Sequence, residues 1–307
     1  MKNFTVKKLP SLERLWEFID SHFIFVAILP AVIIFLLFTI YPAIELVLMS
    51  GSSITFENAE LIREPALEKN IVKFLDDWIF RKALVNTLIF VLLSTSIEML
   101  FGFGLALAVN ELVRGRGIVR TTMLLPILIP PVAIGSIWRL MYNSEFGVIN
   151  AFLELFGIPA QQFLGSTSTA LLSVVVVDIW HWTPLVFLIL LAGLEALPEE
   201  VMEASSIDGA TYNQKLRFII IPLMWPALIV AFMFRSIVAF KVFDQIFLLT
   251  SGGPGTSTEV ISLYVYKVFF QQNQLGYGAL LALITIGIIC SYLAVFAIAQ
   301  RKFTGAK

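Results

Sequence analysis

The stretch Ala170–Leu194 reads ALLSVVVVDIWHWTPLVFLILLAGL and decides the fold class of this chain. Asp178 is its only residue of the Asp, Glu, Lys and Arg types, and most of the other positions are apolar. The hydrocarbon core of a bilayer needs about 20 consecutive apolar residues per helix. A run of this length and composition therefore predicts a helix that crosses a membrane.

Five further stretches have the same character, so the sequence predicts about six membrane helices. In chain order they are Phe23–Met49, Ala83–Val109 and Arg120–Tyr142 before the quoted run, and Leu223–Thr250 and Gly276–Ala299 after it. Prolines interrupt the third and fifth spans, and membrane helices tolerate them where neighbouring groups satisfy the freed carbonyls. These prolines are Pro126, Pro130, Pro131 and Pro226. The predicted fold class is an all-α integral membrane protein with kinked helices.

Composition supports this prediction and excludes other classes of protein. The chain has 307 residues, of which 58% are hydrophobic and only 14% charged. Soluble domains carry about 25% charged residues, so a disordered chain, a nucleic-acid binder and an ordinary soluble enzyme are excluded. A net charge of −1 implies no strongly charged partner, and the single cysteine, Cys290, excludes an internal disulfide and a cysteine-based metal site.

The distribution of lysine and arginine predicts the orientation in the membrane. The N-terminal apolar run is too long for a signal peptide and lacks a cleavage site, so we expect an uncleaved first span. With both termini in the cytoplasm, the cytoplasmic segments hold 12 basic residues and the outer loops hold 6, as the positive-inside rule requires. The cytoplasmic set is Lys2, Lys7, Lys8, Arg14, Arg114, Arg116, Arg120, Lys215, Arg217, Arg301, Lys302 and Lys307; the outer set is Arg63, Lys69, Lys73, Arg81, Lys82 and Lys267. The first outer loop opposes this bias, because it alone holds five of the outer residues.

The segment 195–222, between the fourth and fifth spans, is polar and is predicted to form two short helices joined by a tight bend. Its signals are a proline and two glutamates for the first helical turn, a glycine for its end, and a threonine–glutamine capping box for the second helix. These residues are Pro198, Glu199, Glu200, Gly209, Thr211 and Gln214, with Pro222 before the next span. On these signals alone, an ordinary amphipathic hairpin at the membrane surface is an equally good interpretation.

The same segment resembles the EAA motif of importer-type ABC transporter permeases. The family pattern is Glu-Ala-Ala, three residues, Gly, nine residues and Ile-x-Leu-Pro. Here Glu203-Ala204-Ser205, Gly209 and Ile219-x-Ile221-Pro222 keep the full spacing, with Ser205 and Ile221 as mild departures. The segment also lies in the expected loop, before the penultimate span.

Three other stretches resemble carbohydrate-uptake permeases of the maltose type. Phe243–Pro254 with Thr258 is similar to the FD…LT-x-GGP…T segment, 147–150 (GVIN) to the G-x-I-N signature, and 276–279 (GYGA) to the opening of the last span. The resemblance runs from about residue 80 to the C-terminus. It divides the chain into residues 1–80, with the first helix and an outer loop, and residues 81–307, a core permease domain with the coupling loop 195–222.

The resemblance implies a type I ABC importer permease fold, in which this chain moves a sugar or polyol across the cell inner membrane by alternating access. The implied partners are a second homologous permease chain, two ATPase subunits, and an external solute-binding protein that meets the outer loops 51–82, 143–169 and 251–275. The chain has no phosphate-binding loop, so we assign it no catalytic residue, metal or cofactor, and expect ATP and Mg²⁺ on the ATPase subunits. The chain is expected to lie in the lipid membrane, and no nucleic-acid partner is expected. The implied contact with the ATPase is made by Glu203, Ala204, Ser205, Asp208 and Gly209.

Ionisable residues inside the predicted spans are candidates for the solute pathway, because such residues usually face a cavity or a partner. Four such residues stand out, namely Asp178, Arg235, Lys241 and Asp244. Pairing within the bundle is the alternative, and Lys241 and Asp244, three residues apart, suit such a pair on one helix.

The segment 178–184, DIWHWTP, combines aromatic faces with hydrogen-bonding groups, as a sugar site does. An aromatic belt at the membrane interface is the alternative. The family resemblance implies a pathway near His181, Trp182, Leu185, Arg235, Ser236, Ala239 and Val242. Ala239 and Val242 are apolar where the disaccharide carrier of the family has amides, so the resemblance does not fix the substrate.

Three other functions fit the sequence less well. A stand-alone ion-coupled secondary carrier is expected to show internal repeats, and none is visible. An intramembrane enzyme needs a catalytic constellation, but neither His22 nor His181 lies in an H-E-x-x-H pattern. A permease for an amino acid or peptide is disfavoured by the FD…GGP segment.

Overall fold

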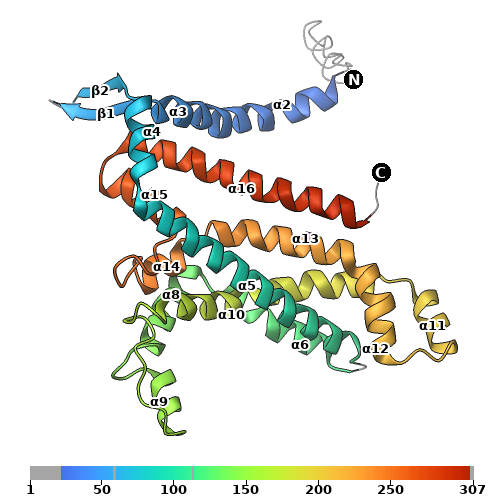
Figure 1. Ribbon diagram of the computed structural model, residues 1–307. Coiled ribbons are helices and arrows are strands. Elements are labelled where there is room, and N and C mark those ends of the chain that lie inside the picture. Colours follow the sequence, from blue (N-terminus) through green and yellow to red (C-terminus); the bar gives the residue numbers. More distant parts are fainter. Residues whose placement is uncertain (1–21, 58–59, 113, 305–307) are drawn as a thin grey trace, which may run out of the picture.

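The computed structural model describes residues 22–57, 60–112 and 114–304, and its long helices form one bundle (Figure 1). Among these residues, five helices are long and apolar enough to cross a membrane, or six if a bent helix pair counts as one span. Lys2, Lys7, Lys8, Arg14 and Lys307, on which the predicted orientation partly rests, lie outside the described residues.

The first span agrees with the predicted range, and a π-helical turn interrupts it. Its parts are α2 (Phe23–Phe35), η1 (Leu36–Ile40) and α3 (Tyr41–Ser50). The π turn ends just before Pro42, the second residue of α3. Proline lacks a backbone N–H and disturbs the regular hydrogen-bond ladder, so the helix changes its pattern at this point.

A small hairpin and a short helix follow the first span, within the predicted outer loop 51–82. Strand β1 (Ser52–Glu57) pairs antiparallel with β2 (Glu60–Pro65), so that Ser52 lies opposite Pro65. Helix α4 (Leu67–Asp76) leads from the hairpin into the second span. No sequence pattern predicted these strands, and the other regular elements of the described residues are helices.

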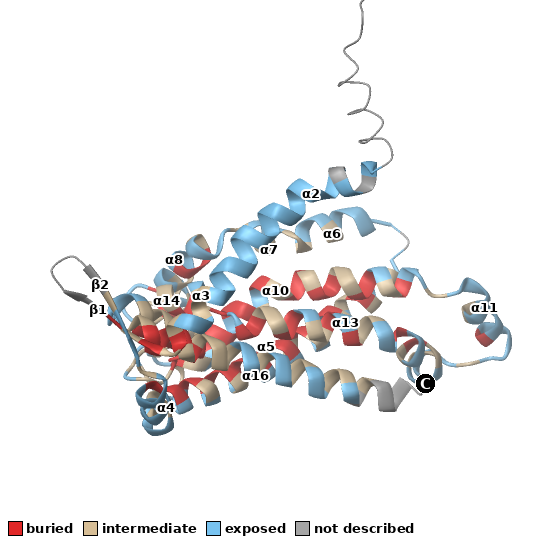
Figure 2. Cartoon of the chain, turned by 90° about the horizontal axis from the view of Figure 1, so that it is seen from above, coloured by how far each residue is buried: buried red, intermediate tan, exposed pale blue. Residues whose placement is uncertain are grey.

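The second and fourth spans form the centre of the bundle. Helix α5 (Trp78–Asn110) extends the predicted span at its start, and α10 (Ala170–Glu195) agrees with the prediction. In its most apolar window, 61% of the residues of α10 are buried within the chain, against none in the first span. Figure 2 shows this contrast between the buried residues of α10 and the exposed surface of α2. The outer helices therefore leave their apolar faces to lipid or to another chain.

The third span is bent by 89° between two helical parts. These parts are α6 (Arg116–Met123) with α7 (Leu125–Leu128), and α8 (Pro131–Met141). Two consecutive prolines explain the bend, because a residue before proline is restricted to extended conformations. Ile129 and Pro130 both adopt such conformations, with ψ angles of 127° and 138°. A short helix, α9 (Val148–Glu154), follows α8.

The fifth span differs from the prediction at both ends. Its parts are α12 (Tyr212–Lys215), η2 (Leu216–Ile220) and α13 (Ile221–Phe240). The second helix of the predicted helix–turn–helix is therefore the beginning of this span rather than a separate helix. The predicted end at Thr250 was wrong, because the chain leaves the helical conformation after Phe240 and forms α14 (Asp244–Leu249), which packs against α8 and α10.

The last span follows two short elements. They are α15 (Ile261–Tyr266) and η3 (Lys267–Gln271), and then comes α16 (Leu275–Thr304), which contains the predicted range. Asp77 joins this part to α5: it caps the helix by accepting from the N–H of Phe80 (2.9 Å). Its carboxylate also accepts from the hydroxyls of Tyr264 (2.7 Å) and Tyr277 (2.5 Å). The beginning of α2 and the end of α16 lie at the same end of the bundle as α11 (Figure 1).

Candidate functional site

Helix α11 (Glu199–Ile207) projects from one end of the bundle, and its ends agree with the sequence signals (Figure 1). Pro198 is its N-cap, and Gly209 has a φ of 73°, the left-handed conformation that ends a helix. The predicted capping box of Thr211 and Gln214 is present at the start of α12. Local sequence rules therefore account for the bend between α11 and the fifth span.

One face of α11 packs against the bundle, and the other is open. Ser205 is buried, and Met202 packs against the apolar cluster formed by α5, α10 and α13. The open face presents Glu203, Ala204 and Ile207, and the side chain of Ile207 is 86% exposed. Asp208 and Gly209 are exposed as well. Of the predicted contact residues, Ser205 alone faces inward.

Three charged side chains meet inside the bundle. Arg235 on α13 lies between Glu98 on α5 and Asp178 on α10, and all three are at most 2% exposed. Nη2 of Arg235 donates to Oε1 of Glu98 (2.8 Å) and to Oδ2 of Asp178. Nε of Arg235 lies 2.5 Å from Oε2 of Glu98, as an ion-pair contact. One guanidinium thus faces two carboxylates and joins three helices.

A cavity of about 190 Å³ lies next to this cluster, between α10, α14 and the break after α13. Its walls are both polar and aromatic, which suits a solute with hydroxyl groups. The lining residues are Pro131, Asp178, His181, Trp182, Val238, Lys241, Val242, Phe243, Asp244 and Gln245. The break in the fifth span makes room for this cavity, because it turns α14 back against α10.

The structure separates the predicted pathway residues into two groups. Asp178, His181, Trp182, Val242 and Asp244 line the cavity. The other four do not: Leu185 is half-buried elsewhere on α10, and Arg235, Ser236 and Ala239 are buried inside the bundle.

Pairing within the bundle, the alternative interpretation, applies to Arg235. Ser236 is engaged as well, since its hydroxyl donates to the carbonyl of Phe232 (2.8 Å) and accepts from Tyr292 (3.2 Å). The expected pair of Lys241 and Asp244 is absent from the described residues. Helix α13 ends at Phe240, before both residues, and Asp244 begins α14, so the two residues do not share one helical face.

Two residues of this region were not predicted. Glu98 is the only Asp, Glu, Lys or Arg residue within the predicted second span, so an ionisable residue in an apolar run was the available signal. Gln245 is uncharged and lies in a stretch of apolar residues, and no single-sequence pattern distinguishes it. Only the return of α14 against α10 brings it to the cavity.

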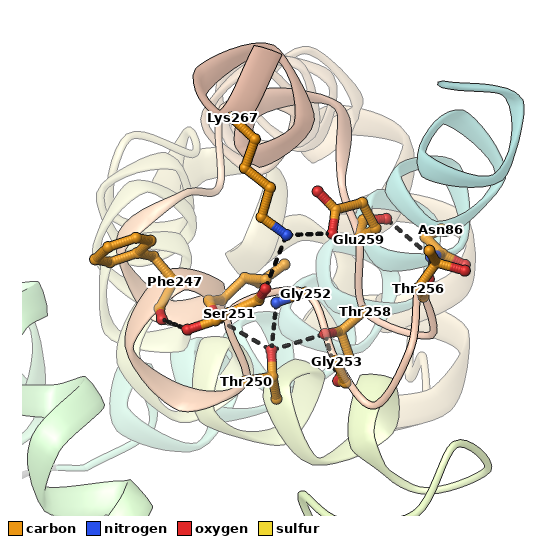
Figure 3. A network of polar contacts seen from close by, with 11 residues as sticks. Asn86, Phe247, Thr250, Ser251, Gly252, Gly253, Thr256, Thr258, Glu259 and Lys267 are labelled. Atoms are coloured by element: carbon orange, nitrogen blue, oxygen red, sulfur yellow. Dashed lines mark hydrogen bonds and ion pairs between the residues drawn. The ribbon is translucent and has the colours of Figure 1, made fainter. Parts of the chain in front are cut away.

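The loop after α14 is held by a polar network that Figure 3 shows. The hydroxyls of Thr250 and Thr258 are hydrogen-bonded (2.7 Å), and Asn86 on α5 donates to the carbonyls of Thr256 (3.0 Å) and Glu259 (2.8 Å). Nζ of Lys267 binds the Glu259 carboxylate (2.6 Å) and the Ser251 carbonyl (2.9 Å). Burial raises the pKa of the Glu259 carboxyl, and Lys267 opposes this shift. The residues that resemble the family's GGP segment therefore fix the loop between α14 and α15.

Gly252 is required at the centre of this network, and replacing it by alanine is expected to destabilise the chain. Its φ is 91°, and a Cβ there would lie 2.1 Å from Oε2 of Glu259 and 2.8 Å from Nζ of Lys267. Gly252→Ala should therefore lower stability by about 1–3 kcal/mol, the usual cost of a strained backbone residue, and by a further amount because the Cβ displaces the Glu259–Lys267 pair. The thermal unfolding midpoint in detergent measures this effect.

Gly255 provides the matched control for that substitution. Its φ is also positive, at 60°, but a Cβ there would meet no atom within 4 Å. Gly255→Ala should lower stability only by the cost of placing a residue with a Cβ in the left-handed conformation. Equal destabilisation by the two substitutions would contradict a specific role for the contact of residue 252 with the Glu259–Lys267 pair.

Asn150, in the stretch that resembles the G-x-I-N signature, holds the loop between α8 and α10. Its side chain donates to the carbonyls of Asn143 (3.2 Å) and Gln161 (3.0 Å) and accepts from the N–H of Gln161 (2.9 Å). It is 3% exposed. These contacts give the motif a structural role at the end of the bundle opposite α11.

Comparisons with known proteins agree with the resemblance. Residues 98–305 match the family described as binding-protein-dependent transport system inner membrane component. The trehalose/maltose transport system permease protein MalF of Thermococcus litoralis is 37% identical over 68% of this chain and 71% of its own. The sulfoquinovosyl glycerol transport system permease protein SmoG of Agrobacterium fabrum is 30% identical over 94% of both chains.

A solved structure shares the fold. It is a chain of a bacterial ABC transporter involved in the import of the acidic polysaccharide alginate, with a TM-score of 0.80 and 24% identity over 95% of this chain and 99% of that one. The predicted permease fold is thereby confirmed.

Proposed function

This chain belongs to the family of binding-protein-dependent transport system inner membrane components, and from that premise we propose that it imports a sugar or polyol as the membrane-spanning subunit of an ABC importer. It is a multi-pass membrane protein. Relatives that are at least 30% identical include transport proteins named for trehalose and maltose and for sulfoquinovosyl glycerol, which are all carbohydrates or carbohydrate derivatives. The substrate class proposed here rests on those names together with the chemistry of the cavity.

The cavity beside α10 and α14 is the observation that carries this proposal. It holds an indole ring, an imidazole and an amide in one small space. Sugars present C–H faces that pack on aromatic rings and hydroxyls that need directed hydrogen bonds. Trp182 supplies the ring, and His181 and Gln245 supply donors and acceptors. We therefore assign the solute pathway to this cavity, with Asp178, Val242 and Asp244 on its walls.

A second cavity suggests where the solute enters. It measures about 580 Å³, and residues of the loops 143–169 and 251–275 line it together with residues of α8 and α14. Polar side chains such as Asn143 and Gln162 alternate with the rings of Tyr142 and Phe163. We propose that this end of the bundle faces outward and receives the solute from an external binding protein. Both chain termini and α11 would then lie on the cytoplasmic side of the inner membrane.

The open face of α11 is the proposed contact with the ATPase. Its exposed Ile207 and Ala204 offer apolar area, and Glu203 offers a charge for a basic or polar partner. In this proposal ATP and Mg²⁺ bind to two separate ATPase subunits, and α11 transmits their closure to the fifth span through the bend at Gly209. Residues 81–307 form the core that moves, together with a second permease chain, while residues 1–80 add the first span and the hairpin.

Gentle affinity purification of the tagged chain tests this function. We expect a second permease chain and an ATPase to co-purify from mild detergent. With its binding protein, the complex should hydrolyse ATP faster when a transported sugar is added. A folded chain that purifies alone, or uptake that continues without ATP while an ion gradient is held, would contradict the proposal and favour a secondary carrier.

A further inference from the structure

Gln245 and His181 meet at the wall of the cavity. Gln245 lies in the first turn of α14, and His181 lies near the middle of α10. The two side chains are 4% and 2% exposed, and Nε2 of Gln245 lies 3.1 Å from Nδ1 of His181. Both residues line the cavity.

This contact fixes what the pair presents to a ligand. If one amide N–H donates to Nδ1, the imidazole carries its proton on Nε2, and the pair retains a free acceptor (the amide oxygen) and free donors (Nε2–H and the second amide N–H). If the amide is turned, Nδ1–H donates to the amide oxygen, and the free groups are the amide N–H and the Nε2 lone pair. In either arrangement the pair offers at least one donor and one acceptor.

The free amide group has no partner within the described residues. Oε1 of Gln245 is fully buried and accepts no hydrogen bond there. Buried polar atoms are rarely left unpaired. Because Gln245 is a lining residue of the cavity, a small turn of its amide toward a group that enters the cavity would give this oxygen a partner. A hydroxyl matches the pair, because it donates and accepts at once.

The neighbouring groups favour an uncharged hydroxyl over an anion. Arg235 is already paired with Glu98 and Asp178. Lys241, the cation among the lining residues, shares the cavity with the carboxylates of Asp178 and Asp244. The guanidinium of Arg235 also lies 5.3 Å from the ring of Trp182, whose centroid is 4.9 Å from that of His181. The indole ring therefore borders the pair and offers a face for the C–H side of a sugar ring.

We infer that Gln245 and His181 act as one unit that reads a single hydroxyl group of the transported solute, so that Gln245 is a specificity-determining residue. This inference rests on the proposed function, since it concerns the solute of the same cavity. It requires that the pair loses its selectivity when either member is removed.

The experiment has two stages, which separate this inference from the proposed function. Uptake of maltose, trehalose and sorbitol into proteoliposomes that hold the complete importer first finds a transported solute. Failure of all three would count against the proposed function and against this inference with it. Equilibrium binding of the radiolabelled transported solute and its monodeoxy analogues to the membrane complex, without the binding protein, then tests the pair.

We expect one monodeoxy analogue to bind the wild-type complex about 3- to 10-fold more weakly than the parent solute, the usual effect of one hydrogen bond. Gln245→Met should weaken binding of the parent solute by the same factor and leave binding of that analogue unchanged. His181→Leu should have the same effect on binding as Gln245→Met. The double variant should lose no more affinity for the parent solute than either single variant, because the two residues form one unit.

Gln272→Met, at an exposed position outside the cavity, is the matched control and should bind the parent solute as the wild type does. Co-purification with the partner chains checks that each variant assembles. The inference is overturned if Gln245→Met weakens binding of the parent and all analogues equally, if it only prevents assembly, or if the transported solute does not bind the membrane complex. Each of these results would give Gln245 a structural role alone.

Discussion

Arg235→Leu is expected to prevent the chain from assembling into a stable complex. The substitution leaves the carboxylates of Glu98 and Asp178 buried together without a cation, at 0% and 2% exposure. Removing one partner of a buried ion pair costs about 3–5 kcal/mol. Two carboxylates lose their partner here, and that loss is comparable with the whole stability of many folded domains. The yield of a monodisperse complex after detergent size exclusion measures the effect, together with its thermal unfolding midpoint.

Glu98→Gln is the informative companion to that substitution. It leaves Arg235 with Asp178, one cation with one anion, and the amide oxygen can still accept from Nη2. We therefore expect the Glu98→Gln chain to assemble. The variant that combines Arg235→Leu with Glu98→Gln and Asp178→Asn should recover much of the lost yield, since no charge then remains unpaired. Normal assembly of Arg235→Leu alone would show that the cluster does not support the fold.

Glu203→Lys is expected to abolish ATP-driven uptake while the chain itself remains folded. Glu203 lies on the open face of α11 and forms no ion pair within the described residues. Inside the folded chain the reversal of charge should therefore be tolerated. At the proposed contact with the ATPase it would place a cation where a basic or polar group is expected, and like charges across an interface are strongly unfavourable. Uptake should fall by about tenfold or more, because each 1.4 kcal/mol lost at the contact is a tenfold change.

The measurement compares ATP-dependent uptake with the thermal unfolding midpoint of the same variant. Arg114→Glu reverses an exposed charge between α5 and α6, outside α11 and outside the outer loops proposed to meet the binding protein, and is the matched control. It should retain uptake. Normal uptake by Glu203→Lys would contradict the coupling role of α11, whereas a lowered midpoint would reveal a structural role for Glu203.

Local rules were sufficient for much of the fold. Runs of apolar residues predicted most ends of the membrane helices to within a few residues. They did so because burial in lipid constrains every position of a span. The bend after α11 followed from Gly209 and the capping box at Thr211, since glycine conformation and helix capping depend only on neighbouring residues. The spacing of the EAA-like segment identified the family, which the match over residues 98–305 confirms.

Hydropathy was insufficient where an apolar segment leaves its helix. The sequence from Leu223 to Thr250 is apolar almost throughout, yet α13 ends at Phe240 and α14 turns back against α8 and α10. An apolar side chain is stable both in lipid and in a protein core. Composition therefore does not distinguish one long membrane helix from two shorter helices that pack against the bundle. For this reason the alternative of a pair of Lys241 and Asp244 on one helix does not apply.

The sequence by itself determined that this protein is a bundle of membrane helices with a polar helix and a tight bend before the fifth span, and to which family it belongs. The tertiary structure alone decided which polar residues meet. Arg235 contacts Glu98, which is 137 positions away in the sequence, and Asp178, which is 57 positions away. Gln245 contacts His181, which is 64 positions away. Periodicity and capping act within a few residues, whereas these contacts depend on how whole helices pack.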